Sequence, residues 1–321
     1  MALSQMEVFN KYYMSATIET LGQMIDKFNQ QSAGAIRLTT TGFEGDFLQE
    51  SFFAAIHSAQ RRVDRYAANG TASATDLSEL KHNSVKVAGG FGPIRYEPSQ
   101  MTWLLRPTAQ GVEVASRNFA EALLADQLNA SLNALVAAIG NNADVTNDVS
   151  ADGGVDYLAI NGAHAKFGDR SGDIVADIMT GTQYHKMLGN NIANANTLFE
   201  QGNVRIIENV LGKRVIVTDA PALFESGTPD KAKVLSLVQG AAIVTDAGDV
   251  ISNIQTVNGK DRIETTLQLD YSFGLGLKGY AWDVANGGKS PSDAALSTGS
   301  NWDRVATDRK HTAGVLTIGQ A

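Results

Sequence analysis

The chain has 321 residues, a net charge of −8 at pH 7, a pI of about 5.1 and no cysteine. Its length exceeds the ~250–300 residues at which a single core usually stops growing, so two lobes are expected. The acidic balance argues against a dedicated nucleic-acid-binding protein. The lack of cysteine excludes disulfides, thiol catalysis and cysteine-ligated metals. Charged residues make up only 19% of the chain, against ~25% in an ordinary soluble domain, which indicates surface that contacts other protein.

The sequence carries no sign of a membrane partner. No apolar run approaches the ~18 residues of a membrane span. The first 16 residues, MALSQMEVFNKYYMSA, lack the basic start and apolar block of a signal peptide. We expect a protein that is made in a cytoplasm and either stays soluble there or assembles.

The first third of the chain predicts helices and then an extended excursion. Apolar residues in 1–31 recur every three or four positions, and residues 47–68 repeat this pattern, so both segments predict amphipathic helices. Residues 83–106 instead alternate apolar and polar side chains on both sides of a glycine cluster. The simplest interpretation is a β-hairpin that turns around Gly89, Gly90, Gly92 and Pro93.

Residues 112–139 predict one long helix. They contain no glycine or proline, and Gly111 and Gly140 bracket them. At ~1.5 Å per residue this segment would be a rod of roughly 42 Å. One apolar stripe runs along it at helical spacing, through Phe119, Leu123, Leu124, Leu128, Leu132, Leu135, Val136 and Ile139.

The remaining residues mix short helices with strands. Residues 141–156 are a polar connector, and several β-rich runs follow, ending in an antiparallel-looking pair near residues 265–284. Regular alternation of strand and helix is missing. The pattern therefore predicts an α+β fold with hairpins.

One stretch, LGKRVIVTDAP at 211–221, resembles a strand that delivers a catalytic acid, Asp219. The pentapeptide IVTDA, however, occurs at 216–220 and again at 243–247. An aspartate between a strand and a proline or glycine is a common turn former, because its side chain binds nearby backbone amides. We interpret Asp219 as a structural turn and Pro221 as the residue that fixes the exit.

No other motif predicts chemistry. GGFGP lacks the Gly-Lys-Ser/Thr ending of a phosphate loop, and GDRSGD at 168–173 lacks the ligand pattern of a calcium loop. The five histidines show no metal-binding spacing, and no nucleophile motif occurs. We therefore predict no catalytic, cofactor-binding or metal-binding residue and no enzymatic activity.

Three stretches carry a resemblance to a known family. They are KFGDRSGDIVADIMTGTQYHKML at 166–188, FEQGNVRIIENVLGKRVIVTDAPAL at 199–223, and GLGLKGYAWDVANGGKSPSDAALSTGSNWDRVATDRKHTAGV at 274–315. In this order they resemble the major capsid proteins of tailed bacteriophages with the Hong Kong 97-type fold.

The resemblance implies an architecture. In that fold, residues 1–45 would be an N-terminal arm and 46–106 the start of a peripheral domain with an extended β loop. Residues 107–140 would be the spine helix. Residues 141–255 would form the axial domain, and 256–321 would return to the peripheral domain and end in a C-terminal segment.

The resemblance also implies a function. The chain would be a structural shell protein that self-assembles into the pentamers and hexamers of an icosahedral head, which matures from a procapsid and encloses double-stranded DNA. A separate scaffolding protein, a portal and, as an optional partner, a decoration protein would join it, and DNA contact would be non-specific. Assembly in the bacterial host cytoplasm would place the protein in the virion. The alternative is the shell of a cellular nanocompartment of the same fold. A secreted β-rich adhesin fits the composition, but the missing signal peptide and the long helix oppose it.

Charge adds one hypothesis about subunit contacts. Residues 81–106 hold four basic residues against one acidic residue, whereas 141–177 hold seven aspartates against two basic residues. We predict that the basic excursion lies over the acidic surface of a neighbouring subunit. The predicted contacts are Lys86 and Arg95 on one side and Asp144, Asp148 and Asp152 on the other.

Overall fold

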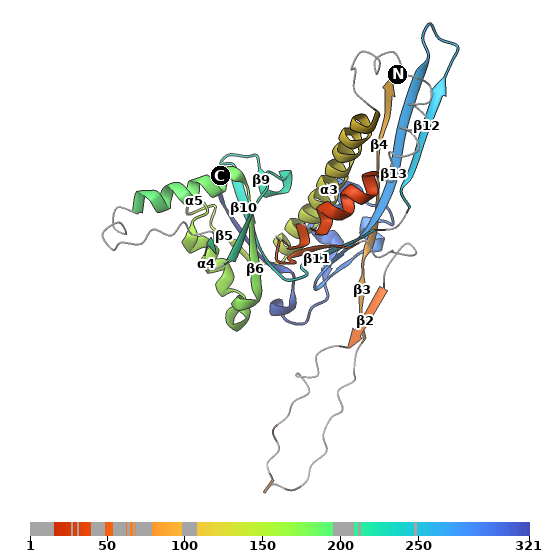
Figure 1. Cartoon of the computed structure of the whole chain (residues 1–321). Helices are drawn as coiled ribbons and strands as arrows, with labels where there is room; N and C mark the ends of the chain where they lie inside the picture. The colour runs from red at the N-terminus through yellow and green to blue at the C-terminus, as the bar shows by residue number, and fades with distance from the viewer. Residues whose placement is uncertain are drawn as a thin grey trace.

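Two β-sheets lie on either side of one long helix, with a thin hairpin projecting from the body (Figure 1). The computed structural model describes residues 16–26, 28–30, 32–39, 49–53, 62, 65–66, 68, 79–97, 108–194, 209–210, 213–246 and 249–321. Within these ranges the fold is α+β, as the sequence predicts. Much of the predicted N-terminal arm, residues 1–15 and 40–45, lies outside the described residues, but 16–26 and 28–30 are helical as expected.

The long helix is α3, Thr108–Gly140. Its 33 residues span roughly 50 Å at ~1.5 Å per residue. It begins before the segment 112–139 that the periodicity predicts, so Gly111 lies inside it, and it ends at Gly140, just beyond that segment. By length and composition alone residues 116–140 could cross a membrane, but 56% of its most apolar 18-residue window is buried inside the fold. The helix is therefore the core helix of this body.

The first sheet is built around β13, Glu264–Leu277. On one edge β13 pairs with β12 and then with β11, and on the other edge it pairs with β4. Alternate residues of β13 are buried and join the core that contains α3. The other strands are β1 (Ile36–Thr39), β4 (Val85–Tyr96), β11 (Ala242–Asp246), β12 (Ile251–Val257), β14 (Tyr280–Trp282) and β15 (Trp302–Arg304).

The hairpin turn predicted at Gly89, Gly90, Gly92 and Pro93 is wrong. All four residues lie inside the continuous strand β4. Between the pairs Ile94↔Leu267 and Phe91↔Leu269, β4 advances three residues while β13 advances two. Gly92, with φ +105°, and Pro93 therefore form a one-residue bulge instead of a turn.

Cross-strand packing explains the other two glycines. A Cβ atom at Gly89 would lie 2.9 Å from the Tyr271 ring, and one at Gly90 would lie 2.8 Å from the Asp270 carboxylate. These contacts are closer than side chains tolerate. The glycine cluster thus marks close packing against β13, which a sequence pattern cannot distinguish from a turn.

The projecting hairpin is formed by β2 (Gln49–Phe53) and β3 (Glu79–Asn83), which pair antiparallel. It points away from α3 and the second sheet (Figure 1). The helix predicted over 47–68 is wrong at 49–53, where the chain is a strand. Most residues between β2 and β3 lie outside the described ranges. The projecting strands Gln49–Phe53 and Glu79–Asn83 therefore precede the segment where the sequence predicted a turn.

The second sheet has the strand order β5-β16-β10-β6-β8-β7, with β9 also on β10. Helices α4 (Tyr157–Ala165) and α5 (Gly181–Asn194) accompany it. Its strands are β5 (Thr146–Asp148), β6 (Ile174–Met179), β7 (Asn209–Val210), β8 (Lys213–Val217), β9 (Phe224–Glu225), β10 (Lys231–Val238) and β16 (Gly314–Gln320).

The described chain passes between the sheets after α3, after β10 and after β15. The change after β10 occurs near residue 240, so β11 and β12 lie in the first sheet, before the boundary expected at 255. The last strand, β16, returns to the second sheet. Short helical turns complete the fold: η2 (Gly168–Asp173), η4 (Pro221–Leu223), α6 (Val284–Gly287), α7 (Asp293–Leu296), η5 (Gly299–Asn301) and η6 (Arg309–His311).

Asp219 has a structural task. It follows β8, and its Oδ1 accepts a hydrogen bond of 2.9 Å from the backbone N–H of Gly181, the first residue of α5. The carboxylate thus satisfies one of the free N–H groups at the start of that helix. Pro221 begins η4, where its missing N–H costs nothing.

Replacing Asp219 should lower the stability of the part of the fold that contains the second sheet and α5. Asp219→Ala removes the acceptor at the start of α5, and we expect it to lower the free energy of unfolding by ~1 kcal/mol. Asp219→Asn keeps an acceptor and should retain most of the stability. Urea denaturation of unassembled protein, followed by circular dichroism, measures both. Equal losses in the two variants would contradict the capping role.

Gly299 tests how closely η5, the turn before β15, packs on the end of α3. A Cβ atom there would lie 2.8 Å from the Ala137 carbonyl oxygen and 2.7 Å from the Asn141 Cβ. Because backbone atoms must move, Gly299→Ala should destabilise the protein by ~1–3 kcal/mol in urea denaturation. Gly189→Ala is the matched control: its Cβ would meet nothing within 4 Å on α5, so it should raise stability by up to ~1 kcal/mol. A neutral Gly299→Ala would show that η5 can move off α3 at no cost.

Candidate subunit-contact surfaces

The two predicted basic contact residues have partners in their own chain. Lys86 Nζ lies 3.1 Å from Asp249 Oδ2, and Arg95 Nη1 lies 3.3 Å from Glu264 Oε1. Both cations are on β4, on the face of the first sheet turned away from α3. Lys86 lies between the buried Val85 and Val87, and Arg95 pairs with Thr266, next to the buried Leu267. The Arg95 side chain is 64% exposed and that of Lys86 only 29%. Arg95 is therefore the better placed to reach a second chain.

Asp249 shows how the Lys86 contact is stabilised. Partial burial of this carboxyl raises its pKa, but hydrogen bonds from Ser272 and Lys86 outweigh burial, so the pKa is held below its usual value. The Ser272 hydroxyl donates to Asp249 Oδ1 at 2.5 Å, and the Ser272 backbone N–H donates at 3.1 Å. Through its contacts with Lys86 and Ser272, Asp249 links β4, β13 and the segment before β12. This is a role inside one subunit.

The three predicted acidic residues lie along residues 144–152, from just before β5 to the turn after it. Asp144 Oδ2 is 2.7 Å from Arg304 Nη1. Asp148 accepts the backbone N–H of Ser150 at 2.9 Å, and hydrogen bonding from Ser150 lowers the pKa of its carboxyl. Asp152 is exposed in the turn that follows. The three acids thus lie along one short segment that contains β5 of the second sheet, whereas the two cations are on β4 of the first sheet.

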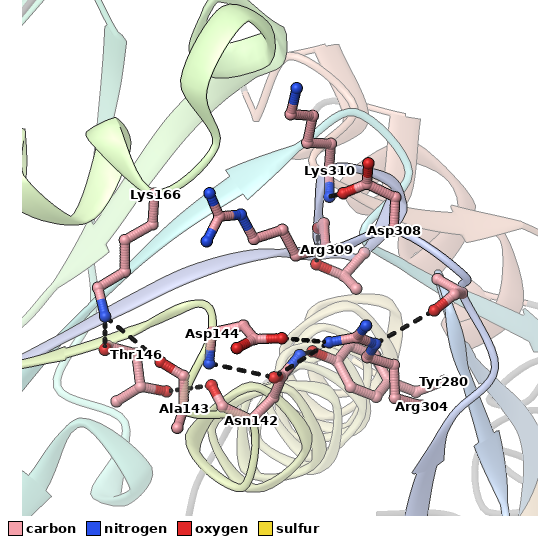
Figure 2. A network of polar contacts seen from close by, with 12 residues as sticks. Asn142, Ala143, Asp144, Thr146, Lys166, Tyr280, Arg304, Asp308, Arg309 and Lys310 are labelled. Carbon is pink, nitrogen blue, oxygen red and sulfur yellow. Dashed lines mark hydrogen bonds and ion pairs between the residues drawn. The ribbon is translucent and has the colours of Figure 1, made fainter.

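Figure 2 shows the polar network where α3 ends and the chain enters the second sheet. Thr146 Oγ1 donates to the carbonyls of Ile139 at 2.8 Å and of Asn142 at 3.0 Å. Lys166 Nζ, at the end of α4, donates to the carbonyls of Thr146 at 2.5 Å and of Ala143 at 3.3 Å. These bonds satisfy carbonyl groups at and just beyond the last turn of α3.

Lys166 also places a positive charge near the C-terminal end of α3. The last turn of that helix contains no basic residue. A cation near the negative end of the helix dipole stabilises it by ~0.3–1 kcal/mol. The two acceptors of Lys166, the carbonyls of Ala143 and Thr146, lie beyond the end of the helix, so its hydrogen bonds join the end of α4 to the connector and to β5. On the other side of the junction Arg304, on β15, holds Asp144 in the same network (Figure 2).

Exposed apolar side chains gather at the outer edge of the first sheet. Among the described strands β12 pairs only with β13, so its other edge is open. Ile251 and Val257 on β12 and Ile263 in the following turn are exposed, Ile251 to 65%. Leu158 on α4 is similarly exposed in the other half of the chain. An open edge with apolar side chains is a typical site for contact with another chain.

The one buried His–Asp contact described in the fold is remote from solvent. His164 Nε2 on α4 lies 3.3 Å from Asp177 Oδ1 on β6, and the two residues are 6% and 0% exposed. A dissolved substrate cannot reach them. Within the described ranges, no group of three His, Asp or Glu side chains could hold a metal ion. The geometry of these residues supports a structural role.

The sequence analysis did not predict several contacts of the polar network at the end of α3. Arg304 and Asp144 are 160 positions apart, and Lys166 acts on carbonyls about 20 positions earlier. No local pattern marks such partners. The sequence indicated that Asp219 is a structural residue, but it did not show that its partner is Gly181, 38 positions away.

Comparison with known proteins shows which family the chain resembles. Residues 5–316 match the Gp13-like family, described as major capsid protein 13-like. A comparison with curated proteins gives no match.

Among solved structures, the chain is similar to the capsid asymmetric unit of cyanophage Pam1, with a TM-score of 0.55 and 12% identity over 89% of this chain and 88% of that chain. It is also similar to Microbacterium phage Oxtober96, with a TM-score of 0.53 and 13% identity over 90% of each chain. The capsid of cyanophage P-SCSP1u gives 0.50 and 10% identity over 76% of this chain and 84% of that chain. At such identities the structures show a shared capsid-protein fold, and the family match spans almost the whole chain. The chain belongs to the major capsid protein 13-like family and is the structural shell protein of a tailed-phage head.

Proposed function

We propose that copies of this chain form the pentamers and hexamers of a closed icosahedral head that encloses double-stranded DNA. The observation that carries this proposal is the β2–β3 hairpin, which extends away from α3 and the second sheet (Figure 1). A two-stranded hairpin is marginally stable alone and needs a surface to pack on. In a repeating heterologous assembly the neighbouring subunit supplies that surface.

We assign the parts of the subunit on the same basis. The first sheet with α3 is the peripheral domain, α3 is its spine helix, and the β2–β3 hairpin is the base of the extended loop. The second sheet with α4 and α5 is the axial domain, and residues 1–45 are the N-terminal arm. Because the chain passes between the sheets three times, these domains are parts of one body and not independent domains joined by a single linker.

The subunit works by contact and not by catalysis. Burial of the open β12 edge and of exposed Leu158 between copies would remove apolar surface from water, so much of the stability lies between subunits. A separate scaffolding protein, a portal and an optional decoration protein complete the head, which assembles in the host cytoplasm and matures from a procapsid. DNA contact is non-specific and weakens with salt.

Of the predicted charge contacts between subunits, the proposal keeps the one made by Arg95. Lys86 is partly buried against Asp249, so its charge serves its own subunit first. Arg95 is exposed, and its partner Glu264 is also held by Lys260 at 2.6 Å. Of the two predicted cations, Arg95 is the one that can turn to a neighbouring acidic connector, in which Asp152 is exposed.

Electron microscopy tests the proposed function. The full chain, purified with and without its scaffolding partner, should form closed shells, and shells from the native source should contain DNA. Protein cargo in those native shells would instead indicate a cellular nanocompartment. Monodisperse monomers in the presence of the scaffolding partner would contradict the shell proposal.

Arg95→Glu tests the charge contact. We expect folded protein, since Glu264 keeps Lys260, but fewer particles, because one exposed contact of ~0.2–1 kcal/mol is lost at every subunit. Arg117→Glu on α3 is the matched control: this side chain is 68% exposed and also ion-paired. Particle yield is measured by sedimentation at low and high salt. Equal yields from the two variants would contradict a role of Arg95 between subunits.

A further inference from the structure

The loop that joins β12 to β13 contains an asparagine followed by a glycine. Val257 and Glu264 are the last paired residues of the two strands, and the loop between them, residues 258–263, reads NGKDRI. It forms the tip of the β12–β13 hairpin (Figure 1), and every residue in it is exposed. Asn258 and Gly259 are therefore open to water in the folded subunit.

An Asn–Gly pair can react with itself in water. The glycine backbone nitrogen loses its proton to solvent and attacks Cγ of the asparagine side chain. The new C–N bond closes a five-membered succinimide ring, and the side-chain nitrogen takes a proton from solvent and leaves as ammonia. Water then opens the ring at either of its two carbonyl groups, which leaves aspartate or isoaspartate. Glycine favours the attack because no Cβ shields its nitrogen.

The chain contains four Asn–Gly pairs, which begin at residues 69, 161, 258 and 286. The pair at 69–70 lies outside the described residues. Ring closure requires a side chain that can swing toward the next backbone nitrogen, and it requires that this nitrogen is not held in a hydrogen bond. The fold therefore decides which of the three described pairs can react.

Asn258 meets both requirements. Neither its side chain nor the N–H of Gly259 forms a hydrogen bond in the part of the chain that the structure describes. Gly259 has φ +94°, and no atom lies within 4 Å of the position that a Cβ would take there. The loop can therefore rearrange to bring the two reacting atoms together without breaking a helix or a strand pair.

Asn286 is held in place. Its Nδ2 donates to Asp283 Oδ2 at 2.5 Å, and the N–H of Gly287 donates to the Asp283 carbonyl at 2.8 Å within α6. A Cβ at Gly287 would overlap the Trp282 ring, so this backbone is tightly packed. Both reacting groups of the pair are thus already engaged.

The Asn161–Gly162 pair is protected by α4. It lies inside this helix, where backbone N–H groups donate to carbonyls four residues earlier. A Cβ at Gly162 would lie 3.2 Å from Asn147 Nδ2, so the helix is also closely packed at this point. Reaction at residue 161 or 286 must therefore wait until the local structure opens.

We propose that Asn258 is a site of spontaneous deamidation in the folded subunit, with water as the only co-reactant and aspartate and isoaspartate as the products. The reaction replaces a neutral amide with a carboxylate. Loop 258–263 has two basic residues and one acidic residue, so its net charge changes from +1 to 0. The modified group belongs to a single subunit, so this inference does not depend on the proposed shell.

Peptide mapping tests the site on the folded, unassembled full chain after incubation in mildly alkaline buffer. Trypsin releases residues 234–260 as one peptide, which contains both Asn258 and Asn253. Asn253 is the matched control: it is exposed on β12, but the β-branched Ile254 follows it. In tandem mass spectra we expect the mass gain of amide hydrolysis at Asn258 and not at Asn253. Deamidation at Asn258 should be about tenfold or more faster than at Asn161 and Asn286, because those sites react only after local opening.

Two further controls separate structure from sequence. In guanidinium chloride the three described Asn–Gly pairs should react at similar rates, because unfolding removes the protection of α4 and α6. Asn258→Gln keeps an amide at the tip but would need a larger ring, so this variant should stay unmodified. Folded chain in which Asn258 reacts no faster than Asn253, Asn161 or Asn286 would overturn the proposal. An advantage of Asn258 that persists in guanidinium chloride would overturn its structural basis.

Discussion

The structure depends on the C-terminal half of α3, which is buried against both sheets at once. Leu135 and Ile139 on this helix are fully buried, and the cluster they belong to includes Phe273 and Leu275 of the first sheet and Leu316 of the second. Neither sheet has a separate core on this side. The polar network around Lys166 and Arg304 closes the end of the helix from both directions. The angle between the sheets is thus set by close packing, which tolerates little change.

The sequence predicts what is local and misses what is distant. The period of α3 could be recognised because every third or fourth residue faces the same core. The glycine cluster of β4 was misread, because Gly89 is required by the ring of Tyr271, about 180 positions later, and that need resembles the need of a turn. The strand Gln49–Phe53 was taken for a helix, since its apolar residues fit a helical period as well as a strand.

The predicted contact residues show the same limit of sequence analysis. The analysis of charge found the right residue types but paired them across subunits, whereas Lys86 and Arg95 have carboxylate partners on the same chain. Composition alone cannot show which charges are already neutralised inside the fold.

The threefold passage of the backbone between the sheets has a mechanical consequence. A force that pulls the second sheet away from the first is carried by three covalent links side by side, after α3, after β10 and after β15. Loads carried in parallel are shared, so each link bears only part of the tension. Two of the links lead into β5 and β16, which are neighbouring strands, and the third leaves β10, on the other side of β16. Tension therefore enters the second sheet across three adjacent strands and shears their ladders together, instead of unzipping one strand at a time.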